Sequence, residues 1–174
     1  MYLVSLYFDD KTSKEINRYM GLIARKSGNV FMEDNNVPPH ITVASIETLE
    51  EKLLIEKINT LKKGISPGSV DFVSVGQLLP SVIYLVPVLN KYLFDIEEEI
   101  FNSLRDINDI RFSKYYKPYS WLPHVTVGKN LDKEQMKKAF EVMLNNFVPF
   151  NGQVVEIGLA KTNPYTDIIK IKLG

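Results

Sequence analysis

The chain has 174 residues, which is too short for two catalytic domains. Of these residues 45% are hydrophobic and 24% charged, a composition typical of one globular domain. Its 21 basic and 21 acidic residues balance, which excludes a general electrostatic attraction to nucleic acid or membrane surfaces. It contains no cysteine, which excludes disulfides and thiolate sites, and no apolar run near the ~18 residues of a membrane span, so we expect a cytoplasmic protein.

Hydrophobic periodicity and capping residues predict the secondary structure, beginning with a strand rather than a signal peptide at residues 2–8. The elements that follow are a helix from Thr12 to Gly28, a strand at 40–46, a helix from Thr48 to Gly64, strands at 70–79 and 82–88, a helix from Asn90, a long connection at 107–123, a strand at 124–130, a helix from Asp132, and strands near 152–161 and 167–173. Asn163, Pro164 and Tyr165 separate the last two strands. The acidic run 97–99 is expected to be solvated helix surface.

The predicted elements form a repeat. Each half runs strand, helix, loop, strand, helix, strand, and no linker or change in composition separates the halves. Duplicated halves usually pack about a pseudo-twofold axis, so we expect one bilobal domain over residues 1–174.

The two histidines of the chain occur in the same five-residue frame, once in each half. The first is Pro39-His40-Ile41-Thr42-Val43 and the second is Pro123-His124-Val125-Thr126-Val127. Side chains alternate between the two faces of a strand, so each histidine shares a face with its threonine. If the halves pack about a twofold axis, the sequence brings two imidazoles and two hydroxyls together.

Two imidazoles can carry out acid–base chemistry near neutral pH, because one accepts a proton while the other donates one. Threonine hydroxyls can hold the oxygens of a phosphoryl group as negative charge develops. This set favours attack on phosphorus without a metal or other cofactor. A metal site is not expected, since the two imidazoles lack a third ligand at a recurring spacing.

On these motifs the chain resembles the 2H phosphoesterase superfamily, in particular its 2′-5′ RNA ligase and cyclic phosphodiesterase branch. The resemblance implies an α+β fold that is bilobal and duplicated about a pseudo-twofold axis. Two small, mostly antiparallel sheets would flank a central cleft, with the helices packed outside. It also implies that the catalytic residues are His40, Thr42, His124 and Thr126.

Substrate contacts are expected from a basic, aromatic segment before the second motif and from two further positions. Lys129 stands where many relatives have an arginine, and Tyr84 resembles an aromatic residue found on the corresponding strand of relatives. In the segment, cations can offset phosphate charge and rings can stack on bases, or the rings can instead anchor the loop to the core. Its candidates are Arg111, Lys117, Tyr119 and Trp121, with Lys161 and Lys170 as weaker candidates in the last strands.

The expected function is therefore metal-independent hydrolysis of 2′,3′-cyclic phosphates of nucleotides or RNA ends, by a monomer. Two other classes stay open. The same site could join or cleave 2′-5′ linkages or trim RNA ends, or the chain could bind nucleotides or RNA ends without catalysis. The sequence does not decide which histidine is the base.

Overall fold

The computed structural model describes residues 1–61, 64–162 and 165–174, so Asn163 and Pro164 lie outside the described residues. Its elements are β1 (Tyr2–Phe8), α1 (Asp10–Ser27), α2 (Phe31–Asp34), β2 (His40–Glu47), α3 (Glu51–Leu61), β3 (Gly68–Leu78), β4 (Val82–Pro87), α4 (Lys91–Leu104), β5 (Arg111–Phe112), β6 (Val125–Gly128), α5 (Lys133–Asn146), β7 (Phe150–Lys161) and β8 (Thr166–Lys172). Within these residues the strands form one antiparallel sheet, β5-β2-β1-β7-β3-β4-β6, with β8 paired to β7.

The strand order shows the expected duplication. From the centre outwards, one side of the sheet runs β7-β1-β2 and the other runs β3-β4-β6. The halves exchange their last strands, because β7 of the second half pairs with β1 and β3 of the first half pairs with β4. The pseudo-twofold axis therefore passes between β3 and β7. Among the described strands, β8 has no counterpart in the other half of the sheet.

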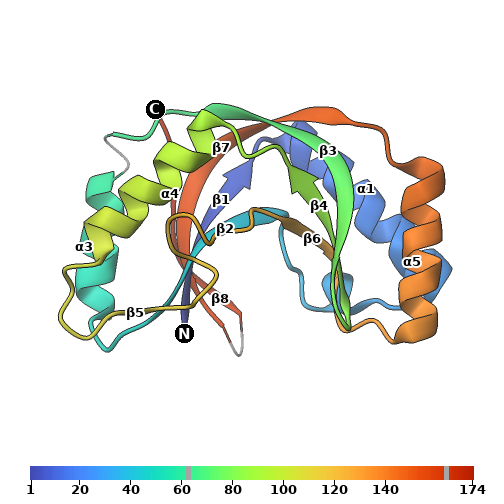
Figure 1. Ribbon diagram of the computed structural model, residues 1–174, viewed down its shortest axis with the longest axis horizontal. Coiled ribbons are helices and arrows are strands. Elements are labelled where there is room, and N and C mark those ends of the chain that lie inside the picture. The colour runs from blue at the N-terminus through green and yellow to red at the C-terminus, as the bar shows by residue number, and fades with distance from the viewer. Residues whose placement is uncertain (62–63, 163–164) are drawn as a thin grey trace.

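The α+β class is confirmed, but the two sheets expected from the resemblance are joined into one. The joining pair is β3 with β7, through the register Gly68↔Val154 to Phe72↔Phe150. At 11 and 12 residues, β3 and β7 are long enough to pair both with each other and with a strand of one lobe. Figure 1 shows them arching across the molecule.

The helices also pair across the two halves. α1 packs on α5 and on β6, while α3 packs on α4, which contacts β2. The two helix pairs lie at opposite ends of the molecule (Figure 1). Each lobe therefore takes one helix from each half of the sequence. No helix of the described residues is long and apolar enough to cross a membrane.

Three predicted helix ends are confirmed, and two predicted helix starts are shifted. The helix expected from Thr48 begins at Glu51, and the Thr48 hydroxyl accepts a hydrogen bond from the Glu50 backbone N–H just before it. Gly28 ends α1 in the left-handed conformation (φ 76°), Asn90 caps α4, and Asp132 forms a capping box at α5. At α1 the cap is Asp9 rather than Thr12, because the Asp9 carboxylate accepts a 2.8 Å hydrogen bond from the Thr12 backbone N–H. Thr12 is buried inside the helix, where its hydroxyl accepts a hydrogen bond from the backbone N–H of Gln153.

Glu97 is buried, contrary to the expectation of a solvated acidic run. It is only 3% exposed, and within the described chain its Oε1 has no hydrogen-bond partner. The helical period explains this, since Glu97 lies four residues after Leu93 and three before Ile100, on the buried face of α4. Burial raises its pKa to about 7, with a smaller contribution from the charge of Glu98.

We predict that Glu97→Gln stabilises the protein above pH 7 and not below about pH 4.5. The folded state holds the Glu97 proton more tightly than the unfolded state, so Glu97 reduces stability increasingly as the pH rises from about 4.5 to about 7. The gain in unfolding free energy at pH 8 should be on the order of 2 kcal/mol. Urea unfolding at pH 5 and pH 8 measures it. The exposed Glu98→Gln is the matched control, and an equal gain in both variants would contradict the assignment.

Candidate active site

The two motif strands hold equivalent places in the sheet and carry the same irregularity. His40 is the first residue of β2, beside β1, and His124 directly precedes β6, beside β4. The pairing register shifts at Val43, between Thr42 and Ala44, and again at Val127, between Thr126 and Gly128. A bulge of this kind bends the strand and redirects its side chains. β2 and β6 approach within 8 Å between Cα atoms, so the fold brings the motifs together.

Both imidazoles are oriented by the same backbone contact. His40 Nδ1 lies 2.7 Å from the carbonyl oxygen of Pro38, and His124 Nδ1 lies 2.9 Å from that of Leu122. A carbonyl oxygen only accepts hydrogen bonds, so Nδ1 carries the proton and donates it in both rings. The Nε2 atoms are then the positions at which protons can be accepted or released.

Both histidines are half-buried, and both have lowered pKa values. Burial is the main cause at each residue, opposed by the hydrogen bond to Pro38 or Leu122. The pKa of His40 is lowered further by the charges of His124 and Lys170 and raised by that of Asp167.

The two threonines lie opposite different residues. Thr42 is 8% exposed, and its hydroxyl lies 3.4 Å from that of Ser5, its partner on β1. Thr126 is half-buried and pairs with Tyr84 on β4. Ser5 and Tyr84 occupy equivalent positions, because each also pairs with a glycine on its other side, Gly158 or Gly76.

Tyr84, which the resemblance indicated as a substrate contact, lies at the second motif. Its ring packs edge-on to that of His124 with centroids 5.2 Å apart, and the residue is 7% exposed. A Cβ on Gly76 would come under 3.0 Å from the Tyr84 ring, so the glycine makes room for the tyrosine. Tyr84 thus forms one wall beside His124.

The segment before the second motif divides into an anchored and an exposed part. The indole N–H of half-buried Trp121 donates a 3.0 Å hydrogen bond to the carbonyl of Thr42, which ties the loop to the first motif. Tyr119 is 87% exposed and has a left-handed backbone (φ 65°), which is rare for a bulky residue. Lys117 is exposed in the turn closed by the bond from the Ser120 N–H to its carbonyl.

Arg111 lies far along β2 from His40, whereas Lys129 directly follows the second motif strand. Arg111 pairs in register with Glu47, seven residues along β2 from His40 and so about 23 Å away along the strand. Lys129 is exposed after β6, with Nζ 5.7 Å from the ring centroid of Phe31. Lys161 forms an ion pair with Glu51 instead of reaching the motifs.

The structure adds residues around His40 that sequence reasoning missed or ranked low. Tyr7 is the register partner of His40 on β1, with ring centroids 6.1 Å apart, and the Tyr165 ring lies 6.5 Å away. Asp167 and Lys170 of β8 join them through hydrogen bonds. The alternation of the first strand could have pointed to Tyr7, whereas Tyr165 is 158 positions away from it and carries no local signal.

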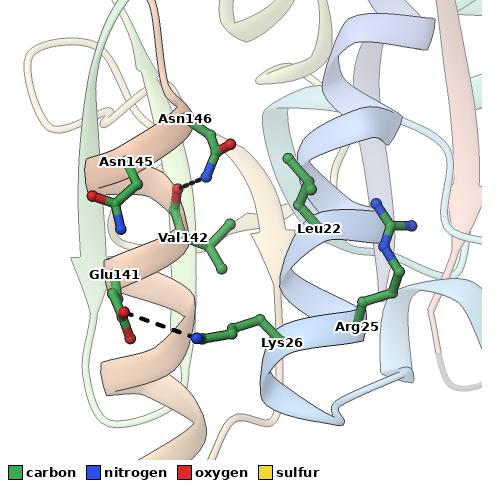
Figure 2. Close-up of a pocket in the computed structure, with 7 residues that line it drawn as sticks. All are labelled: Leu22, Arg25, Lys26, Glu141, Val142, Asn145 and Asn146. Carbon is green, nitrogen blue, oxygen red and sulfur yellow. Dashed lines mark hydrogen bonds and ion pairs between the residues drawn. The ribbon is translucent and has the colours of Figure 1, made fainter.

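A separate groove lies between α1 and α5, outside the sheet, and contains neither motif (Figure 2). Lys26 and Glu141 face each other across it, 3.9 Å apart. Its lining residues are Leu22, Arg25, Lys26, Glu141, Val142, Asn145 and Asn146. Among the described residues, no group of three or more His, Asp or Glu side chains is arranged to hold a metal ion.

The chain is similar to curated proteins described as putative phosphoesterases. "Putative phosphoesterase BH1439" of Halalkalibacterium halodurans is 26% identical over 106 residues, covering 58% of this chain and 57% of the relative. A protein of the same description from Bacillus mycoides is 29% identical over 100 residues, covering 55% of this chain and 54% of its own length. The matches thus span just over half of each curated relative.

Solved structures share the fold over nearly the whole chain. TT0787 of Thermus thermophilus superposes with a TM-score of 0.65 at 12% identity, covering 99% of this chain and 97% of that one. E. coli LigT complexed with phosphate gives 0.56 at 14% identity, with coverage of 99% and 96%. The family model described as "2'-5' RNA ligase superfamily" matches residues 8–165. The chain therefore belongs to the 2′-5′ RNA ligase superfamily.

Proposed function

We propose that the protein is a phosphoesterase that hydrolyses 2′,3′-cyclic phosphates of nucleotides or RNA ends without a metal cofactor. The observation that carries the proposal is the identical setting of the two imidazoles, each donating from Nδ1 to a backbone carbonyl. Membership of the superfamily and the phosphate complex of E. coli LigT, a protein of the same fold, support it.

In this proposal the two half-sites divide one reaction. Water attacks phosphorus as the Nε2 atom of one histidine accepts its proton. The bond from phosphorus to one ribose oxygen breaks, and that oxygen takes a proton from Nε2 of the other histidine. The hydroxyls of Thr42 and Thr126 donate to the phosphoryl oxygens as negative charge builds up on them.

A second candidate uses the same site on longer substrates, by trimming RNA ends or by joining or cleaving 2′-5′ linkages. The exposed Tyr119 ring and nearby Lys117 favour it, because they lie on the segment that leads into the second motif. An exposed ring can stack on a base, and a lysine can offset phosphate charge. A binding module without catalysis has less support, because binding alone does not need two imidazoles.

Replacing either histidine should abolish most of the activity. In EDTA, His40→Gln and His124→Gln should each lower kcat/KM on 2′,3′-cyclic nucleotides by about 10²–10⁴-fold, since each removes one proton-transfer group. Thermal unfolding of each variant checks that the fold is kept. Full rates in both variants would contradict the proposal, as would saturable binding by the wild type with no turnover of cyclic or 2′-5′ substrates.

The pH optimum of kcat/KM should lie below 6.5. The active form needs one neutral and one protonated imidazole, and the pKa values of both are lowered from the ordinary 6.5 by burial. The form with one shared proton is therefore most populated on the acid side of that value. A pH series at constant ionic strength measures this, and an optimum at pH 7 or above is the contrary result.

Tyr119→Ala should separate short from long substrates. Loss of one stacking contact, worth about 1–3 kcal/mol, should lower kcat/KM on RNA ends of several nucleotides by roughly 5–150-fold. Hydrolysis of a mononucleotide cyclic phosphate should change little. Tyr115→Ala, which removes a 64% exposed ring from the same segment, is the matched control. If Tyr119→Ala leaves both substrates unaffected, Tyr119 has no part in binding.

A further inference from the structure

Asp167 and Lys170 of β8, together with Tyr165 just before it, join Tyr7 of β1 in a connected cluster on one side of the site. The Tyr165 hydroxyl donates to Asp167 Oδ1 at 2.9 Å, and Lys170 Nζ donates to Asp167 Oδ2 at 2.8 Å. The single Tyr165 proton is thereby used, so the Tyr7 hydroxyl is the donor in its 2.9 Å contact with the Tyr165 hydroxyl. Lys170 Nζ also makes a cation–π contact with Tyr7, 4.3 Å from the centroid of its ring. We call Tyr7, Tyr165, Asp167 and Lys170 the β8 cluster.

The β8 cluster packs against His40. The Tyr7 ring comes from β1 and the Tyr165 ring from the residue before β8. Their centroids lie 6.1 and 6.5 Å from that of the His40 imidazole. Gly158 permits this approach, because a Cβ there would come under 3.0 Å from both the Tyr7 ring and the Ile169 carbonyl. At His124 the neighbouring ring is Tyr84, and no strand corresponding to β8 pairs beside β3 in the described sheet.

The charged groups around His40 come from three places. The charge of His124 acts on His40 from the second motif, and those of Asp167 and Lys170 act on it from β8. The charge of Glu156 on β7 acts on Tyr7, the register partner of His40. The two tyrosines stay neutral, since burial raises the pKa of Tyr7 to about 12 and also raises that of Tyr165. The cations lower the pKa of His40, while Asp167 raises it. No cation contributes in this way at His124 among the described residues.

We propose that the β8 cluster positions His40 and, through Lys170, makes it the proton acceptor of the pair, with His124 as the proton donor. The Lys170 ammonium lies over the Tyr7 ring, which packs against His40, and its effect on the pKa of His40 exceeds the opposing effect of Asp167. When the two imidazoles share one proton, this favours its placement on His124. In ring opening, the water oxygen then bonds to phosphorus and its proton passes to Nε2 of His40. The ribose oxygen leaves and takes the proton from Nε2 of His124. This assignment rests on the proposed function, whereas the positioning role does not.

Titration of the imidazoles by NMR tests the positioning role without any substrate. The chain has two histidines, so each gives one imidazole Cε1–H signal, assigned from His40→Gln and His124→Gln. In the wild type, the pKa of His40 should be lower than that of His124. Lys170→Met removes a cation and should raise the pKa of His40. Asp167→Asn removes an anion and should lower it. The His124 titration should stay in place in both variants.

Lys172→Met is the matched control, because it removes a cation from the same strand, where Lys172 pairs in register with Glu156. It should leave His40 unchanged. The proposal is overturned if His124 titrates below His40, if the two β8 variants shift His40 in the same direction or not at all, or if Lys172→Met shifts it equally. In kinetics, Lys170→Met should move only the acid limb of the pH profile of kcat/KM, and it should move that limb to higher pH, because the pKa of His40 rises. Opposite NMR shifts without any turnover of cyclic phosphates would refute the proposed function and keep the positioning role.

Discussion

The hydrogen-bonded ladder between β3 and β7 fixes the relation between the two motifs. β2 and β6 do not pair with each other in the described sheet, so the path from His40 to His124 through it runs β2-β1-β7-β3-β4-β6. The central step of that path is five register pairs, from Gly68↔Val154 to Phe72↔Phe150. A slip of one residue there would turn the side chains of a strand to the opposite face. The distance between the imidazoles is thus controlled by residues that touch neither of them.

Within each lobe, the histidine is prepared by local backbone features that both halves share. A proline ends the preceding loop, the imidazole donates to the carbonyl two residues earlier, and the strand bulges at the valine after the threonine. These features depend on residues within about five positions, so they can be duplicated with the motif. The precision of each half-site is local, whereas its placement against the other half-site is a property of the whole sheet.

This division explains what the sequence could and could not predict. The motif strands, the glycine end of α1 and the caps at Asn90 and Asp132 follow from neighbouring residues, and they are confirmed. The exchange of β3 and β7 between halves involves pairs far apart in sequence, which periodicity cannot reveal. The position of Arg111 depends on a similar pairing between distant residues. Its register with Glu47 places it at the end of β2 opposite His40. The helical period predicts the burial of Glu97, whereas the run of three acidic residues around it indicates solvated surface.

Duplication supplies two equal half-sites, but ring opening needs unequal ones, since one imidazole must gain a proton as the other loses one. The structure departs from symmetry beside both motifs. Equivalent sheet positions carry Ser5 beside Thr42 and Tyr84 beside Thr126, so the groups facing the two hydroxyls differ in size and polarity. The added strand β8 carries the ion pair between Lys170 and Asp167 on the side of His40, and no described strand adds such a pair on the side of His124. Because the backbone contacts of the imidazoles are the same, these additions show how residues outside the duplicated motif can make the chemistry of the two histidines differ.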